Sequence, residues 1–113
     1  MTNSLEAAEA EAAAIAKAPR ITLADIERDI SKVYYLTGDK IPGAHKRHIP
    51  ALKCLTICVV VMKNEFTVVG KSDPVEPENF DAKFGKKLAY ENAVRQIWAL
   101  QAYELAGKFY SRL

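Results

Sequence analysis

The 113-residue chain has few of the features that mark membrane proteins, disulfide-rich proteins or polyanion-binding proteins. It has two cysteines, one tryptophan, five glycines and five prolines, and its sixteen Lys and Arg nearly balance fourteen Asp and Glu. A net charge of +2 is too small to indicate a nucleic-acid or membrane partner by itself. The longest apolar stretch, residues 51–62, falls well short of the roughly 20 residues that span a bilayer. We therefore expect one small soluble domain with no membrane partner.

The first twenty residues differ in composition from the rest. Eight alanines lie between positions 7 and 18, and Leu5 and Ile15 are the large apolar side chains of the segment. A helix here would have little with which to dock. Acidic residues interrupt the segment, so it lacks the pattern of a signal peptide. The prediction is a flexible Ala/Glu-rich tail over residues 1–20 and a single α+β domain over residues 21–113.

The two cysteines, Cys54 and Cys58, lie four residues apart in a strand-like run. In a strand their Cα atoms would be roughly 13 Å apart, which is too far for a disulfide between them. They are expected to be free, buried thiols in a reducing cytoplasm.

Residues 20–37 show helical spacing of apolar side chains. Thr22 and Asp25 have the spacing of a capping box, and the prediction is an amphipathic helix that ends near Gly38. The apolar positions are Leu23, Ile26, Ile30 and Val33. A loop with two glycines and two prolines is expected over residues 37–50.

Residues 51–62 predict a strand that is apolar on both faces and must be covered on both sides. A turn at Lys63-Asn64-Glu65 leads into a short second strand that ends at Gly70, which makes a β-hairpin. The segment after the hairpin is acidic, and Asn79 or Asp81 is positioned to cap a following helix.

The last helix is predicted to run to about Phe109 and to have two apolar faces. One face carries Phe84, Leu88 and Trp98, and the other carries Ala89, Ala93, Ile97 and Leu100. The predicted fold class is α+β: an amphipathic helix, a β-hairpin and a long C-terminal helix. This apolar surface exceeds what two helices and one hairpin readily bury, so we expect a homodimer or higher homo-oligomer. The alternative is that the first helix covers one face of the sheet and the last helix covers the other.

Several motifs together carry a resemblance to a known family. They are Leu52-Lys-Cys-Leu-Thr-Ile-Cys-Val, residues 63–72, Pro77-Glu-Asn-Phe-Asp-Ala, Phe84-Gly-Lys-Lys, Tyr90-Glu-Asn-Ala and Ile97-Trp-Ala-Leu. Over about residues 22–105 the chain resembles the gene-product-49/66 family of short tailed-phage proteins. Members usually have Asn-Gly at the hairpin, where this chain has Asn64-Glu65. Because Glu tolerates positive φ poorly, the departure disfavours a two-residue type I′ turn.

The resemblance implies a phage accessory protein that works in the cytoplasm of the bacterial host, and it names no substrate. Small phage proteins often oppose host defence, by blocking a host protein or by sequestering a signalling nucleotide. The α/β dimers that sequester cyclic ADP-ribose signals are broadly similar in architecture, at the level of the fold alone.

The start of the last helix is the first candidate ligand site, because a helix N-terminus and nearby lysines favour an anion. Lys83, Lys86 and Lys87 supply positive charge, and Phe80 and Phe84 can stack on a base; Phe80, Lys83 and Lys87 are the candidate ligand-binding residues here. Asn92, further along the helix among apolar neighbours, is another candidate, because a buried amide needs a partner in the protein or in a ligand. The alternative is that Phe80 anchors the core and that the lysines form a solvated face. The acidic segment that precedes the helix would also repel an anion.

The second candidate site is the basic loop that contains His45, Arg47 and His48. An arginine flanked by imidazoles can hold a phosphate group or a nucleic-acid backbone. A solvated basic loop without a partner is the alternative. A metal site is not expected, because the two histidines lack a third ligand at a diagnostic spacing.

The sequence predicts neither an enzyme nor a cofactor, since no catalytic constellation is present. The leading hypothesis is a counter-defence protein that sequesters a small phosphorylated ligand, such as a cyclic signalling nucleotide, at an interface between chains. One alternative is an inhibitor that docks a host protein through the last helix, with Trp98 and Tyr103 in the contact. Another is a small nucleic-acid-binding protein that uses the Arg47 loop and the basic last helix.

Overall fold

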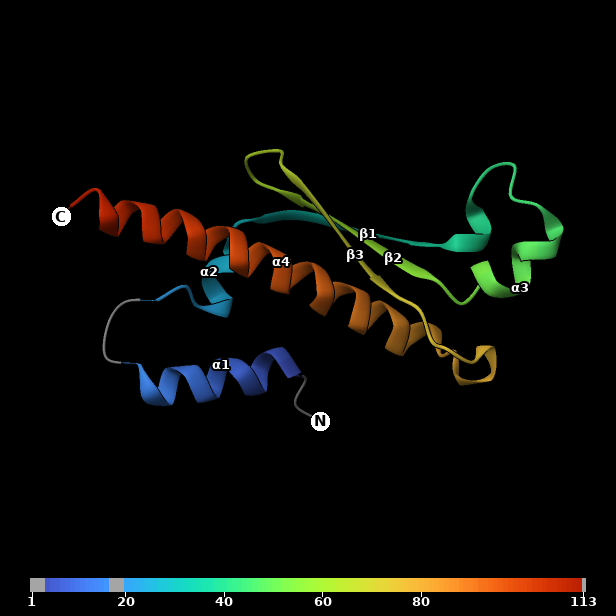
Figure 1. Ribbon diagram of the computed structural model, residues 1–113, viewed down its shortest axis with the longest axis horizontal. Coiled ribbons are helices and arrows are strands. Elements are labelled where there is room, and N and C mark those ends of the chain that lie inside the picture. Colours follow the sequence, from blue (N-terminus) through green and yellow to red (C-terminus); the bar gives the residue numbers. More distant parts are fainter. Residues whose placement is uncertain (1–3, 17–19, 113) are drawn as a thin grey trace.

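A computed structural model describes residues 4–16 and 20–112; the predictions for residues 1–3, 17–19 and 113 lie outside this range. The predicted α+β class is confirmed: a three-stranded antiparallel sheet in the order β1-β2-β3 packs against a long C-terminal helix (Figure 1). The main elements are α1 (Ser4–Ile15), α2 (Leu23–Arg28), β1 (Ile30–Thr37), α3 (Ile49–Leu52), β2 (Thr56–Met62), β3 (Thr67–Ser72) and α4 (Ala82–Tyr110). None of the described helices is both long enough and apolar enough to cross a membrane.

The first predicted helix is mostly wrong. The capping box of Thr22 and Asp25 is present, but the helix it starts, α2, ends at Arg28. From Ile30 the chain becomes strand β1, which pairs with β2 in antiparallel register. Aromatic and β-branched side chains in residues 33–37 favour a strand, and pairing with β2 satisfies their backbone groups.

The predicted hairpin is confirmed, although its first strand begins later than residue 51. Residues 49–52 form the short helix α3, and β2 starts at Thr56. The turn holds three residues between Met62 and Phe66, whose backbones are hydrogen-bonded (2.8 Å). Glu65 has φ 73°, the left-handed conformation that usually follows a type I turn in such a loop. The loop is therefore not a two-residue type I′ turn, although Glu65 does adopt the positive φ that was expected to be unfavourable for it.

Helix α4 runs nearly as predicted, and Asp81 caps it by accepting a hydrogen bond from the N–H of Phe84 (2.8 Å). It packs on β3 and β2 through a stripe of small residues. At Gly70 a Cβ atom would lie 2.2 Å from the carbonyl oxygen of Ala89 and 2.5 Å from the backbone nitrogen of Ala93. The helix can approach this strand so closely because position 70 has no side chain.

The two faces of the sheet have different surroundings. Cys58, Val60 and Val68 point toward α4 and are buried in the core with Ile26 of α2. Because side chains alternate along a strand, Ile57, Val59 and Val61 of β2 point to the opposite face, away from α4 and α2. The alternative that two helices cover opposite faces is therefore wrong within one chain, and the second face is open.

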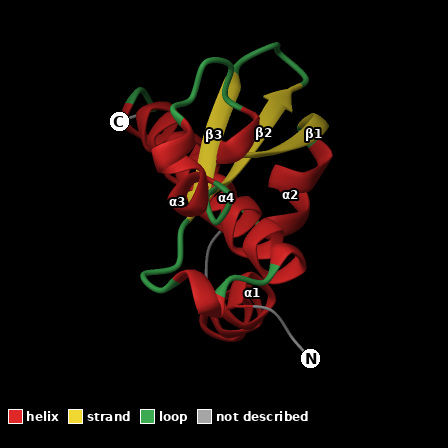
Figure 2. Ribbon diagram, turned by 90° about the vertical axis from the view of Figure 1, so that its right-hand side faces the viewer, coloured by secondary structure: helices red, strands yellow, loops and turns green. Residues whose placement is uncertain are grey.

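The structure has a helix, α1, where the sequence predicted a flexible tail. Both views place α1 away from the strands, on the far side of α4 (Figures 1 and 2). Leu5 reaches the core and is 2% exposed. Ser4 donates a hydrogen bond to the carboxylate of Glu91 (2.7 Å) and accepts one from Arg95 (3.1 Å). A single apolar anchor and a few polar contacts thus dock this helix.

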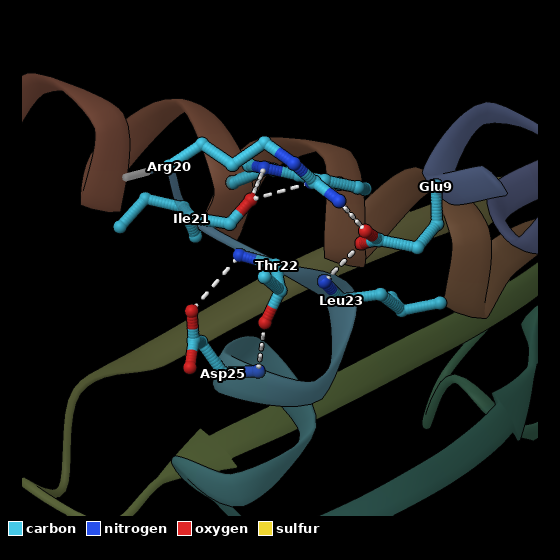
Figure 3. A network of polar contacts seen from close by, with 7 residues as sticks. Glu9, Arg20, Ile21, Thr22, Leu23 and Asp25 are labelled. Atoms are coloured by element: carbon cyan, nitrogen blue, oxygen red, sulfur yellow. Dashed lines mark hydrogen bonds and ion pairs between the residues drawn. The ribbon is translucent and has the colours of Figure 1, made fainter. Parts of the chain in front are cut away.

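A polar network joins α1 to the start of α2 (Figure 3). The carboxylate of Glu9 pairs with Arg20 and accepts the backbone N–H of Leu23. These hydrogen bonds, that of Arg20 first, hold the pKa of Glu9 below its ordinary value. The capping bond from the N–H of Thr22 likewise lowers the pKa of Asp25.

Candidate functional site

A pocket lies between β1 and the first turns of α4. Because α4 packs on β2 and β3, the helix-facing side of β1 is left partly open beside it. The pocket has a volume of about 250 Å³. It is lined by Tyr35, Leu36, Thr37, Lys40, Thr56, Ala82 and Lys86. We refer to it as the wedge pocket.

Two lysines give the wedge pocket a basic rim. Lys40 comes from the turn that follows β1, and Lys86 comes from the second turn of α4. The ammonium nitrogen of Lys86 lies 5.5 Å from the ring centroid of Tyr35, a distance typical of a cation–π contact. A cationic rim beside an aromatic ring suits a ligand that combines a phosphate with a flat ring.

Tyr35 is held as a neutral phenol. Burial and the adjacent Cys58 raise its pKa above the ordinary value. Burial also raises the pKa of Cys58, and a hydrogen bond with Tyr35 only partly offsets this. A buried thiol with a raised pKa is a poor nucleophile. Tyr35 and Cys58 therefore provide an aromatic surface for packing rather than a reactive group.

Thr56 at the inner end of the pocket has an unusual environment. The residue is 1% exposed, and its hydroxyl oxygen has no hydrogen-bond partner among the described residues. Gly85 leaves the room for it, since a Cβ atom there would lie 2.7 Å from the hydroxyl. Buried hydroxyls are normally paired, so this one has an unused hydrogen bond, which lies against Gly85 beneath the wall of the pocket.

The residues predicted at the start of the last helix lie near the wedge pocket but on another surface. Lys83 and Lys87 line a shallow hollow of about 550 Å³ on the outer side of α4, together with Asp81 and Phe84. The capping carboxylate of Asp81 partly offsets their positive charge. Phe80 is half-buried and packs near Gly85, in agreement with its alternative role as an anchor.

The basic loop is exposed to solvent. The side chain of His45 accepts the backbone N–H of Arg47 (3.0 Å), and its ring centroid is 6.0 Å from that of His48. Figure 1 shows this loop, near α3, at the same end of the molecule as the start of α4. His45, Arg47 and His48 flank that end of the molecule, whereas Lys40 and Lys86 line the wedge pocket there.

Asn92 has a structural partner. Its side-chain oxygen accepts the N–H of Lys71 (3.2 Å) and a hydrogen bond from Gln96 (3.1 Å), and Gln96 also donates to the carbonyl of Val69 (2.8 Å). These two side chains occupy backbone groups on the outer edge of β3. Asn92 therefore closes the edge of the sheet, away from the wedge pocket.

The last part of α4 extends beyond the sheet (Figure 1). Tyr103 is 85% exposed and Tyr110 is 78% exposed, whereas Trp98 is half-buried and donates a hydrogen bond to the carbonyl of Ile21 (3.0 Å). Of the two residues predicted to dock a partner protein, Tyr103 is accessible and Trp98 is engaged within the chain.

The predicted ligand-binding residues did not include Lys40 or Lys86, although the charge of Lys86 was counted at the start of the last helix. Helical periodicity contains a signal for Lys86: Gly85, Ala89 and Ala93 mark the buried stripe, and a residue one position after a buried one lies at its flank. Lys83 and Lys87 lie two positions from Gly85 and so point outward. Across the described parts of the chain, no group of three or more His, Cys, Asp or Glu could hold a metal ion.

Comparison with known proteins supplies the family. Residues 21–109 match the model of the phage protein (N4 Gp49/phage Sf6 gene 66) family. Neither the curated proteins nor the solved structures include a match. The matched region contains the sheet, the wedge pocket and nearly all of α4, whereas α1 lies outside it. Because the match covers most of the chain, the protein belongs to the N4 Gp49/phage Sf6 gene 66 family of phage proteins.

Proposed function

We propose that this phage protein is a non-enzymatic binder of a small phosphorylated ligand and that the wedge pocket is its binding site. The unpaired hydroxyl of Thr56, in a pocket rimmed by Lys40 and Lys86, is the observation that carries the proposal. The hydroxyl lies against Gly85, so the side chain of Thr56 would rotate toward the pocket for a phosphate oxygen to accept its proton. The two ammonium groups would balance the phosphate charge. The first turn of α4 adds backbone N–H groups and the positive end of its dipole.

The volume of the pocket bears on the ligand class. About 250 Å³ is slightly below the usual range for small-molecule sites, about 300–1,000 Å³. It suits a phosphoryl group with part of a nucleotide, whose base would stack on Tyr35. In an infected bacterium, such a binder would remove a signalling nucleotide from host defence.

Titration with adenosine 5′-monophosphate and with inorganic phosphate, followed by backbone NMR shifts, tests this proposal. Both probes should shift the signals of residues around Lys40 and Lys86. Lys86→Gln should weaken binding about tenfold, the effect of one charge-assisted hydrogen bond. Lys63→Gln, on the exposed hairpin turn, is the matched control and should leave affinity unchanged.

Tyr35→Leu separates the two parts of the ligand: it should weaken nucleotide binding and leave phosphate binding unchanged. Absence of binding by both probes, or equal effects of the Lys86 and Lys63 variants, would contradict the proposal. The sequence-based site is tested alongside with alanine at Arg47, Phe80, Lys83 and Asn92. If these four variants bind normally while Lys86→Gln does not, the wedge pocket replaces that earlier assignment.

A second candidate function is docking of a host protein, which the exposure of Tyr103 and Tyr110 on α4 favours. Aromatic side chains at such positions are typical anchors of protein interfaces. A photocrosslinker at position 103 should then capture one defined protein, and Tyr103→Ser should abolish inhibition of its activity. Crosslinks to many unrelated proteins would rule this candidate out.

A further inference from the structure

The open face of the sheet is a continuous apolar surface that none of the described residues 4–16 and 20–112 covers. By register and alternation it contains Tyr34 and Leu36 of β1, Ile57, Val59 and Val61 of β2, and Val69 of β3. Tyr34, Leu36 and Val69 are 54%, 43% and 52% exposed. The described helices that pack on the sheet all lie against the other face.

The charges on this face lie at its ends. Lys32 pairs in register with Val61, and Lys71 pairs with Ile57, so the two lysines occupy opposite ends of the surface. Thr67 lies at the same end as Lys32, and the centre has no charge, with the phenol hydroxyl of Tyr34 as its polar group. An apolar centre with a charged rim is the arrangement of a protein interface.

We propose that a second copy of this chain covers the open face, with two sheets stacked face to face. Flat surfaces of β-branched and aromatic side chains pack well on an identical surface, about 10 Å apart, as in β-sandwiches. A two-fold axis brings the same face of each copy into the contact, so both subunits use the same residues at the interface. The proposal does not depend on the wedge pocket, which lies on the helix side and shares Leu36 of the edge strand β1 with the open face.

The size of the face is sufficient for a dimer. Three strands at the usual spacing make a face about 15 Å wide and about 20 Å long. A flat face of that size is about 300 Å² per copy and about 600 Å² for two copies, and the side chains that project from it and from its rim raise the area removed from water toward roughly 1,200 Å², the lower end of the range for stable interfaces. Because this interface is small, we expect a weak, reversible dimer and test for it at micromolar concentrations.

The edges of the sheet favour this geometry over extension through β3. Asn92 and Gln96 already occupy backbone groups of Lys71 and Val69 on that edge. A new strand would have to displace both side chains. The open face, in contrast, has none of the described helices packed on it.

Sedimentation equilibrium of the full chain from about 1 to about 300 µM, a range that brackets a micromolar dissociation constant, tests the proposal. The wild type should rise from 12.5 kDa toward twice that mass. Val69→Lys should raise the dissociation constant at least about 100-fold, because it buries a charge in the interface. Val75→Lys makes the same change at a side chain that is 96% exposed and off the face, and should dimerise normally.

Circular dichroism confirms folding, which Val69→Lys should preserve because residue 69 points to solvent within one chain. A monomeric wild type throughout this range would overturn the proposal and leave the face to another kind of partner. A dimer that survives Val69→Lys but is lost in Tyr103→Lys would place the contact on α4 and would also overturn it.

Discussion

Both faces of the sheet have an apolar centre along β2, but only one of them is buried. Val60 on the helix side is fully buried, whereas Val69 on the open side is 52% exposed. The difference arises because small residues on α4 and Gly70 on β3 let the helix lie directly on one face. Hydrophobicity alone therefore does not decide what a face contacts; the steric fit of the opposing surface does.

The largest effect on stability should come from disrupting the close contact between α4 and the buried face of the sheet. Gly70→Ala places a Cβ atom 2.2 Å from the carbonyl oxygen of Ala89, so α4 must move off the sheet. We expect a loss of about 3 kcal/mol in the free energy of unfolding, measured with urea. Gly107→Ala, where a Cβ meets nothing within 4 Å, is the control and should gain up to about 1 kcal/mol. Equal stabilities of the two variants would contradict the close-packed helix.

A substitution on the buried face of the sheet should raise stability and lower affinity for the ligand. Thr56→Val removes a buried hydroxyl that has no partner, and should stabilise the free protein by about 1 kcal/mol. The same change should weaken phosphate binding. Higher stability with unchanged affinity would mean that Thr56 does not contact the ligand.

The hairpin turn joins β2 to β3 at one end of the sheet and contains a residue with strained backbone geometry. Glu65 adopts φ 73°, which costs a residue with a Cβ atom about 1 kcal/mol. Glu65→Gly should therefore stabilise the fold by about 0.5–1 kcal/mol in thermal unfolding. Glu65→Asn should gain less, and Glu65→Ala should gain nothing from the backbone.

The smallest effect should come from the polar network outside the sheet. The pKa values of Glu9 and Asp25 are lowered in the folded state, so the unfolded chain binds protons first as the pH falls. Their stabilisation is complete above about pH 5 and is lost as the pH falls through the folded pKa values. Glu9→Gln should flatten this loss in acid unfolding curves. A steeper loss in that variant would contradict the assignment.

Much of the fold follows from local sequence patterns. The capping box at Thr22, the hairpin and the cap at Asp81 were all predictable from residue type and spacing. Strand β1 was not, because Ile26, Ile30 and Val33 fit a helical period as well as a strand start. Its partners in β2 lie 19 to 32 residues away along the chain, and that tertiary contact decides between a helix and a strand.

The site was predictable only in its general position. The sequence indicated two separate basic segments, the start of the last helix and the loop that contains Arg47, and the structure shows that both lie at one end of the molecule (Figure 1). Which lysines face the pocket depends on how α4 rotates against the sheet, and the tight contacts of Gly70 and Gly85 set that rotation. Asn92 was interpreted as a ligand-binding residue, but its partner Lys71 is twenty-one residues away in sequence.

The most direct test of the difference between the two faces is the thermal midpoint as a function of protein concentration. If a second copy covers the open face, dissociation accompanies unfolding and the midpoint rises with concentration. The wild type should show this rise, and Val69→Lys should show a constant, lower midpoint. An identical wild-type midpoint at every concentration would mean that this face stays exposed, and would contradict the account.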